Sequence, residues 1–312
     1  MSEQPSWPSV MRTTLHLWFK RRSLRIGRRG VVGLSVLLTA GLVAALCIVL
    51  VIRPGATSAS VTPPGSTQAG QSPDQGPLQA EAALRGQAAA WIAAQVSPAA
   101  IVSCDPAMCA VLQAHGVPSS QLLVLVLADA DPLGSDVVVA TPAVRSQFGA
   151  RLGEVYASEV IASFGSGAQR IDVRAIAPDG AAAFESALPA QNAARITAGQ
   201  QLLANKLMIV AHAARPALAG GEVDPRLLVT LAAIAAQQRV SVLSFGDPSP
   251  GAPDVPLRGA QLRVGTRAEL RTLLSFLRAQ QAPYLPAAIR TAGGNYTVSI
   301  YYDAPGPLGM GG

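Results

Sequence analysis

Small polar and acidic residues follow several of the expected β-strands, at the points where the chain leaves each strand. The candidate ligand-binding residues of this kind are Asp105, Asp129, Asp131, Thr141, Gly165, Ser166, Gly167 and Asp247. In open parallel sheets, ligands lie beyond the carboxyl ends of the strands, where glycine lets the backbone approach them closely. Two converging carboxylates, such as Asp105 and Asp247, would support acid–base chemistry on a glycan. The alternative is structural, because Asp105 and Thr141 each precede a proline and are typical helix caps.

The sequence lacks the motifs of the familiar hydrolases and kinases. The run Phe164-Gly165-Ser166-Gly167 does not have the G-x-S-x-G spacing of a nucleophile elbow. Neither G-K-[ST], H-E-x-x-H nor S-x-x-K occurs anywhere in the chain. The three histidines stand far apart, at positions 16, 115 and 212. We therefore predict no catalytic residue, no metal site and no cofactor.

Cys104 and Cys109 lie at the end of one expected strand and in the first turns of the helix that follows it. Outside the cytoplasm a nearby pair can oxidise, and a tight turn at this spacing brings the two Cα atoms to about 5.5 Å. We predict a disulfide between them. The alternative is that both are small buried hydrophobic side chains.

Alanine-rich helical runs alternate with short β-branched runs from Gln79 nearly to the end of the chain. The expected helices are 79–95, 107–115, 144–152, 192–205, 224–237 and 266–280, and the expected strands are 100–104, 122–127, 136–140, 160–163, 171–176, 207–211, 240–245, 260–264, 287–291 and 296–302. Such alternation predicts an α/β fold in which helical crossovers connect parallel strands. We expect two Rossmann-like halves, 79–190 and 191–312, with mostly parallel strands. The turn Gly293-Gly294-Asn295 predicts a C-terminal hairpin.

The basic charge of the chain is confined to its beginning. Residues 1–30 contain seven of the 24 lysine and arginine residues and a single acidic residue, Glu3, and the rest of the chain contains 17 basic and 17 acidic residues. A nucleic-acid-binding domain needs basic residues clustered on a folded face. We therefore expect no nucleic acid as a partner.

Residues 31–52 form an uncharged, apolar stretch of 22 residues, followed by Arg53-Pro54. A helix of this length crosses the roughly 30 Å hydrocarbon core of a bilayer. Because the basic tail precedes the stretch, the positive-inside rule predicts a single span with a cytoplasmic N-terminus. Residues 53–78 are rich in Pro, Gly, Ser and Thr, and this composition predicts a disordered linker. The alternatives are a cleaved signal peptide, whose apolar region is usually shorter, and a buried core helix.

Two segments resemble soluble extracytoplasmic domains of actinobacterial membrane proteins, including the tails of some multi-pass envelope glycosyltransferases. The segments are WIAAQVSPAAIVSCDPAMCAVLQAHGV and SDVVVATPAVRSQFG, and the likeness covers about residues 85–177. In those transferases the chemistry belongs to the multi-pass part, which this chain lacks, so the resemblance implies a cell-envelope setting and assigns no catalytic residue.

These observations favour a plasma-membrane protein with an extracytoplasmic α/β domain that binds an envelope protein or a glycan and catalyses nothing. Residues 31–52 would hold it in the lipid bilayer. Two alternatives stay open. One is an envelope enzyme that uses strand-end carboxylates on glycan or peptide substrates, and the other is a scaffold subunit of a membrane complex.

Overall fold

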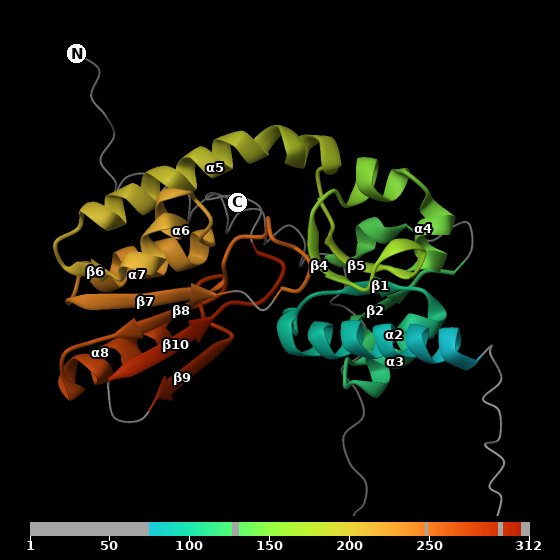
Figure 1. The fold of residues 1–312 in the computed structure, drawn as a ribbon. Coiled ribbons are helices and arrows are strands. Elements are labelled where there is room, and N and C mark those ends of the chain that lie inside the picture. Colours follow the sequence, from blue (N-terminus) through green and yellow to red (C-terminus); the bar gives the residue numbers. More distant parts are fainter. Residues whose placement is uncertain (1–74, 127–130, 247–248, 293–295, 307–312) are drawn as a thin grey trace, which may run out of the picture. The chain divides into compact units, whose positions relative to one another are not determined.

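The computed structural model describes residues 75–126, 131–246, 249–292 and 296–306, which belong to one compact unit that begins at Asp74 (Figure 1). The basic tail, the expected span at 31–52 and most of the expected linker lie outside the described residues, as do Asp129 and Asp247. Among the described residues, no helix combines the length and the hydropathy that a membrane span needs.

The first of two sheets has five strands in the order β2-β1-β3-β5-β4. Its strands are β1 (Val102–Cys104), β2 (Leu122–Val124), β3 (Val137–Ala140), β4 (Val160–Phe164) and β5 (Ile171–Ala175). Strand β1 is parallel to β2 and β3, whereas β5 is antiparallel to β3 and β4. The helical elements of this part are α2 (Gln75–Gln95), α3 (Pro106–Ala114), η2 (Ser119–Gln121), η3 (Pro132–Gly134), α4 (Pro142–Phe148), η4 (Leu152–Tyr156) and η5 (Gly167–Gln169).

Both faces of this first sheet are covered. In β3, Val137 and Val139 belong to one apolar cluster, and Val138 and Ala140 belong to another on the opposite face. A strand buried on both faces is expected to be apolar at every position, and all four residues of β3 are fully buried.

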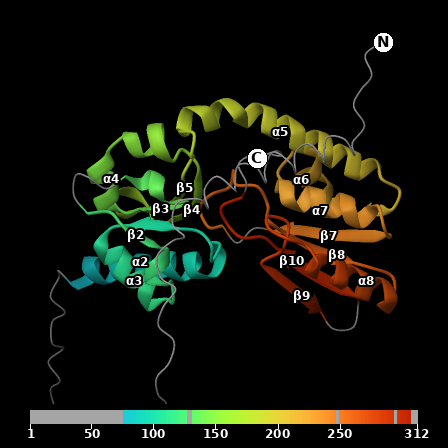
Figure 2. The ribbon, with the colours of Figure 1, turned by 180° about the vertical axis from the view of Figure 1, so that it is seen from behind.

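The second sheet also has five strands, in the order β6-β7-β8-β10-β9 (Figure 1). Figure 2 shows β7, β8, β10 and β9 of this sheet from behind. Its strands are β6 (Met208–Val210), β7 (Val240–Gly246), β8 (Gly259–Arg263), β9 (Ala288–Ala292) and β10 (Thr297–Tyr301), and its helical elements are η6 (His212–Ala214), α6 (Arg215–Ala219), α7 (Pro225–Ala235) and α8 (Arg267–Arg278). Strands β6 and β7 are parallel, and the other three pairings are antiparallel. The predicted C-terminal hairpin is confirmed by the pairing of β9 with β10.

The mixed α/β character is confirmed, but the prediction of two Rossmann-like halves with mostly parallel strands was wrong. Among the described strands, three pairings are parallel and five are antiparallel. The connection 165–170 between β4 and β5 shows the physical reason. It is shorter than the dozen or more residues that a parallel crossover requires, so the two strands can only form a hairpin.

Helix α5 (Ala181–Ala204) connects the part of the chain that forms the first sheet to the part that forms the second. It begins at Ala181 rather than at the expected residue 192, and the expected boundary between residues 190 and 191 falls inside it. Pro189 lies within the helix. Because proline removes one helical hydrogen bond, a helix start upstream of it is difficult to predict from sequence.

The two faces of the second sheet differ, and this difference positions the candidate site. Alternate residues of β8 and β10, including Leu262 and Ile300, pack in an apolar core with side chains of α7 and α8. Because successive residues of a strand point to opposite faces, Gln261 and Ser299 point away from that core. The second sheet therefore buries one face in a core and carries polar side chains on the other.

Candidate ligand-binding site

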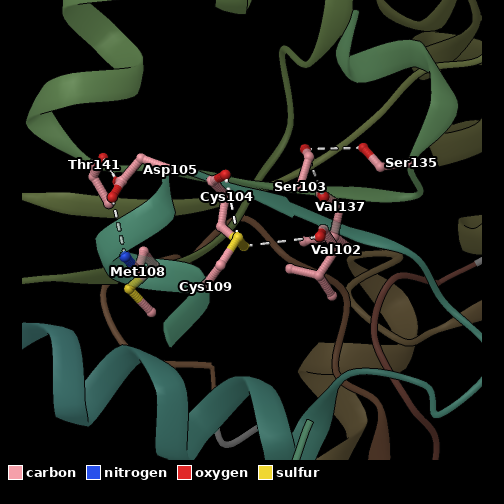
Figure 3. The surroundings of a disulfide bond; sticks show 9 residues. All are labelled: Val102, Ser103, Cys104, Asp105, Met108, Cys109, Ser135, Val137 and Thr141. Atoms are coloured by element: carbon pink, nitrogen blue, oxygen red, sulfur yellow. Dashed lines mark hydrogen bonds between the residues drawn. A yellow bond between two sulfur atoms is a disulfide. The ribbon is translucent and has the colours of Figure 1, made fainter. Parts of the chain in front are cut away.

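Two of the predicted candidates, Asp105 and Thr141, meet at the carboxyl ends of β1 and β3 (Figure 3). The Thr141 hydroxyl donates to Asp105 Oδ2 at 2.5 Å. Asp105 Oδ1 accepts from the backbone N–H of Met108 at 3.0 Å, and Thr141 Oγ1 accepts from that of Val144 at 3.3 Å. Both side chains are buried and cap α3 and α4, so their polar atoms are engaged in the local structure.

The Gly165-Ser166-Gly167 candidates form the tight turn between β4 and β5. Gly165 and Gly167 have φ angles of 72° and 59°, which favour glycine. Arg145 holds this turn from α4, because its guanidinium donates to the carbonyl oxygens of Ala168 and Arg170. Asp131 caps η3 by accepting from the Leu133 backbone N–H. These candidates do not gather around a common cavity.

A disulfide joins Cys104, the last residue of β1, to Cys109 in α3, with the two Cα atoms 5.4 Å apart (Figure 3). Both side chains are buried in the apolar cluster on one face of the first sheet. The bond fixes the start of α3 against the strand whose end carries Asp105.

We expect reduction of this disulfide to lower the free energy of unfolding by about 2 kcal/mol, because the closed loop is short and little chain entropy is removed from the unfolded state. The measurement is denaturant unfolding of the full chain in detergent micelles, followed by circular dichroism with and without reductant. The variant with both Cys104→Ala and Cys109→Ala serves as the control, since its stability should not respond to reductant. Equal stability of the oxidised and reduced wild type would contradict the expectation.

A cleft of about 1060 Å³ lies over the polar face of the second sheet. One wall is the end of α2 with the chain that follows it, residues 92–98, and the segment 115–118 after α3. The floor consists of residues from β7, β8, β10 and β9. Wall and floor are tied together beside the cleft, because the Ser97 N–H donates to the Ala304 carbonyl at 2.9 Å and the Ala304 N–H donates to the Gln95 carbonyl at 2.8 Å.

Four polar residues, which we call the polar row, stand in register across the floor. Ser244 of β7 pairs with Gln261 of β8. Gln261 pairs in turn with Ser299 of β10, and Ser299 pairs with Arg290 of β9. Paired residues on adjacent strands share one face of a sheet, and all four line the cleft. The next row on this face also lines the cleft and includes Gly246, where an added Cβ would meet nothing within 4 Å.

The side chains of the polar row are available to a ligand. Within the described ranges, none of these four side chains makes a hydrogen bond or an ion pair, either with each other or with another residue. On the facing wall, Gln95 Oε1 is buried and has no hydrogen-bond partner among the described residues. The floor of the cleft therefore presents a row of polar side chains with free hydrogen-bonding groups, as small-molecule sites do.

The charged residues in the cleft lining are Arg290 and Asp303. Burial raises the pKa of the Asp303 carboxyl above its usual value, although Arg226 and a hydrogen bond from the Ser97 side chain oppose this. Arg290 is exposed on β9. The described lining of the cleft consequently contains no cluster of cations of the kind that polyphosphates or polyanionic chains require.

A second cavity, of about 70 Å³, is much smaller and is lined by charged residues that include Glu159, Arg195 and Asp224. Burial raises the pKa of the Glu159 carboxyl, although the nearby Arg195 lowers it. The described residues contain no group of three or more His, Cys, Asp or Glu side chains placed to hold a metal ion. With room for little more than a few water molecules, this cavity is a weaker candidate than the cleft.

A comparison with protein-family models found no match, and comparisons with curated proteins and with solved structures found none either. The candidate site therefore has to be judged from its own geometry.

The sequence analysis did not identify the polar row, although a signal was present. In GAQLR (259–263) and TVSIY (297–301), apolar core residues alternate with Gln261, Arg263, Ser299 and Tyr301. Such alternation indicates a strand with one core face and one polar face. Which alternate residues line up side by side depends on strand order and register, and these became known only from the structure.

Proposed function

We propose that this chain is a membrane-anchored binding protein of the cell envelope, and that the cleft over the second sheet is its ligand site. The observation that carries the proposal is the polar row. Four side chains with free hydrogen-bonding groups, aligned on a concave surface, match the few placed polar groups that fix a ligand in a protein cleft.

A binding role accounts for the cleft better than a catalytic one does. Hydrolysis by the usual carboxylate mechanism requires two acidic groups about 5–10 Å apart. Among the described residues, Asp303 is the carboxylate in the cleft lining, and the predicted strand-end carboxylate Asp105 is engaged in capping α3 elsewhere in the structure. Serine, glutamine and arginine side chains in the polar row supply hydrogen bonds and no nucleophile–base pair.

The ligand site is tested by native mass spectrometry of the full chain, purified in detergent from the membranes of cells that express it. We expect a bound small molecule on the wild type and its loss in Gly246→Trp, whose indole would fill the cleft where the structure has open space. The matched control is Ser241→Trp, on the same strand and outside the cleft lining. A mass that persists in Gly246→Trp, or no bound mass on the wild type, would overturn the proposal.

Membrane anchoring by residues 31–52 is tested separately by carbonate extraction followed by blotting. The full-length chain should stay in the membrane pellet, because a single apolar helix of this length resists extraction at high pH. A shortened chain in the supernatant would show that the segment is a cleaved signal peptide.

A further inference from the structure

We propose that the ligand of the cleft is an extended, uncharged oligosaccharide that lies across the strands of the second sheet, along the polar row. This inference rests on the proposed binding function and names the class of ligand. Three features of the cleft support it: the kind of hydrogen-bonding groups, their spacing and the sparse charge.

The hydrogen-bonding groups of the row match those of sugars. A serine hydroxyl and a glutamine amide each donate and accept hydrogen bonds, as every sugar hydroxyl does. Ser244, Gln261 and Ser299 therefore suit a ligand whose surface offers both functions at each position. Arg290 adds donors at the β9 end of the row.

The spacing of the row favours a pyranose chain over a peptide. Adjacent strands lie about 4.8 Å apart, so that a row crossing four strands spans about 14 Å. One pyranose unit in an extended β-1,4-linked chain has nearly the length of one strand spacing, and three units would therefore place hydroxyl groups over successive members of the row. An extended peptide repeats at about 3.4 Å per residue, so its successive residues would not align with successive members of the row.

The sparse charge of the cleft also favours an uncharged ligand. Among the described residues, Arg290 and Asp303 are the charged side chains that line it, one of each sign. Small side chains such as Ala93 and Ala94 form part of the facing wall. An uncharged sugar ring can lie against such a wall without losing the solvation of an ion. A nucleotide or a polyanionic chain would leave most of its charge without a partner in this cleft.

The test measures binding of cellotriose and maltotriose to the full chain in detergent by native mass spectrometry, which also reports any ligand already bound. The two trisaccharides have the same composition, but cellotriose is extended and maltotriose is curved. We expect cellotriose to bind at least tenfold more tightly than maltotriose. Gln261→Ala and Ser299→Ala should each weaken cellotriose binding about fivefold to tenfold, the effect of about one lost hydrogen bond.

The matched controls are Ser241→Ala and Arg263→Gln, which lie on the polar face of the same sheet but outside the cleft lining. Both should leave cellotriose binding unchanged. Equal binding of the two trisaccharides, or equal losses in the row and control variants, would overturn the inference. If neither sugar binds while Gly246→Trp still removes a bound molecule, the oligosaccharide is wrong and the binding function stands. If the wild type also carries no bound molecule, both the oligosaccharide and the binding function are contradicted.

Discussion

Asp224→Ala is expected to lower the free energy of unfolding by about 3–5 kcal/mol, because it leaves a buried guanidinium without its carboxylate partner. Asp224 is 2% exposed and Arg226 is 6% exposed. Asp224 Oδ1 accepts from the backbone N–H of Arg226 at 2.8 Å and from Nε at 3.0 Å, and Oδ2 accepts from Nη2 at 2.8 Å. The substitution thus removes an ion pair and the cap of α7 together.

The control for this prediction is the partly exposed pair of Glu81 and Arg85 in α2, whose atoms approach to 2.7 Å. Because water screens such a pair, Glu81→Ala should change the free energy of unfolding by less than about 1 kcal/mol. Both variants are measured by denaturant unfolding of the full chain in detergent, followed by circular dichroism. Similar small losses in the two variants would show that the buried pair does not hold this region together.

Gly199→Ala is expected to lower the free energy of unfolding by about 3 kcal/mol, at the upper end of the usual cost of overpacking. Gly199 lies in α5, where an added Cβ would stand 2.0 Å from the carbonyl oxygen of Leu218 in α6. The obstacle is backbone, so that no side-chain rotation relieves it. The two helices would have to move apart and open the core beneath them.

Gly86 in α2 provides the opposite case. It lies in a helix interior, and an added Cβ would meet nothing within 4 Å. Gly86→Ala should therefore raise the free energy of unfolding by about 0.5–1 kcal/mol, since alanine loses less backbone entropy in a helix. Thermal and denaturant unfolding of both glycine variants compare them directly. If Gly199→Ala left stability unchanged or raised it as Gly86→Ala should, the close approach of α5 and α6 would be contradicted.

Local features of the fold could be predicted from sequence because they depend on neighbouring residues. Asp224-Pro225 begins α7, and Thr266 with Glu269 forms the predicted capping box of α8. The turn before β10 predicted the C-terminal hairpin. Each of these depends on a hydrogen bond or a turn within a few residues, where the amino-acid types decide the outcome.

Strand direction and the candidate site depend on distant parts of the chain, and the sequence alone did not give them. The apolar run of β3 predicted burial on both faces, but β3 is parallel to β1 and antiparallel to β5. Burial reports what covers a strand and carries no information on the direction of its neighbours. Likewise, Ser244 and Arg290 are far apart in sequence and share a row only because β8 and β10 lie between their strands.

The choice of strand ends as candidate positions also assumed a parallel sheet. In the structure, Asp105 and Thr141 at those ends stabilise the starts of α3 and α4. The open polar surface lies instead on the face of a largely antiparallel sheet, as is common where only one face is packed on a core. The assumption of a parallel sheet therefore directed attention to strand ends rather than to this polar face.

The most direct test of an extracytoplasmic ligand cleft is the labelling of Ser299→Cys by a membrane-impermeant maleimide on intact spheroplasts. The introduced thiol lines the cleft, whereas Cys104 and Cys109 are joined in a disulfide and Cys47 lies in the expected span. We predict labelling without permeabilisation, slowed severalfold by saturating cellotriose, while Ser241→Cys reacts at one rate with or without the sugar. Labelling that requires permeabilised membranes would contradict the extracytoplasmic position of the cleft, and labelling that cellotriose leaves unchanged would contradict the oligosaccharide as its ligand.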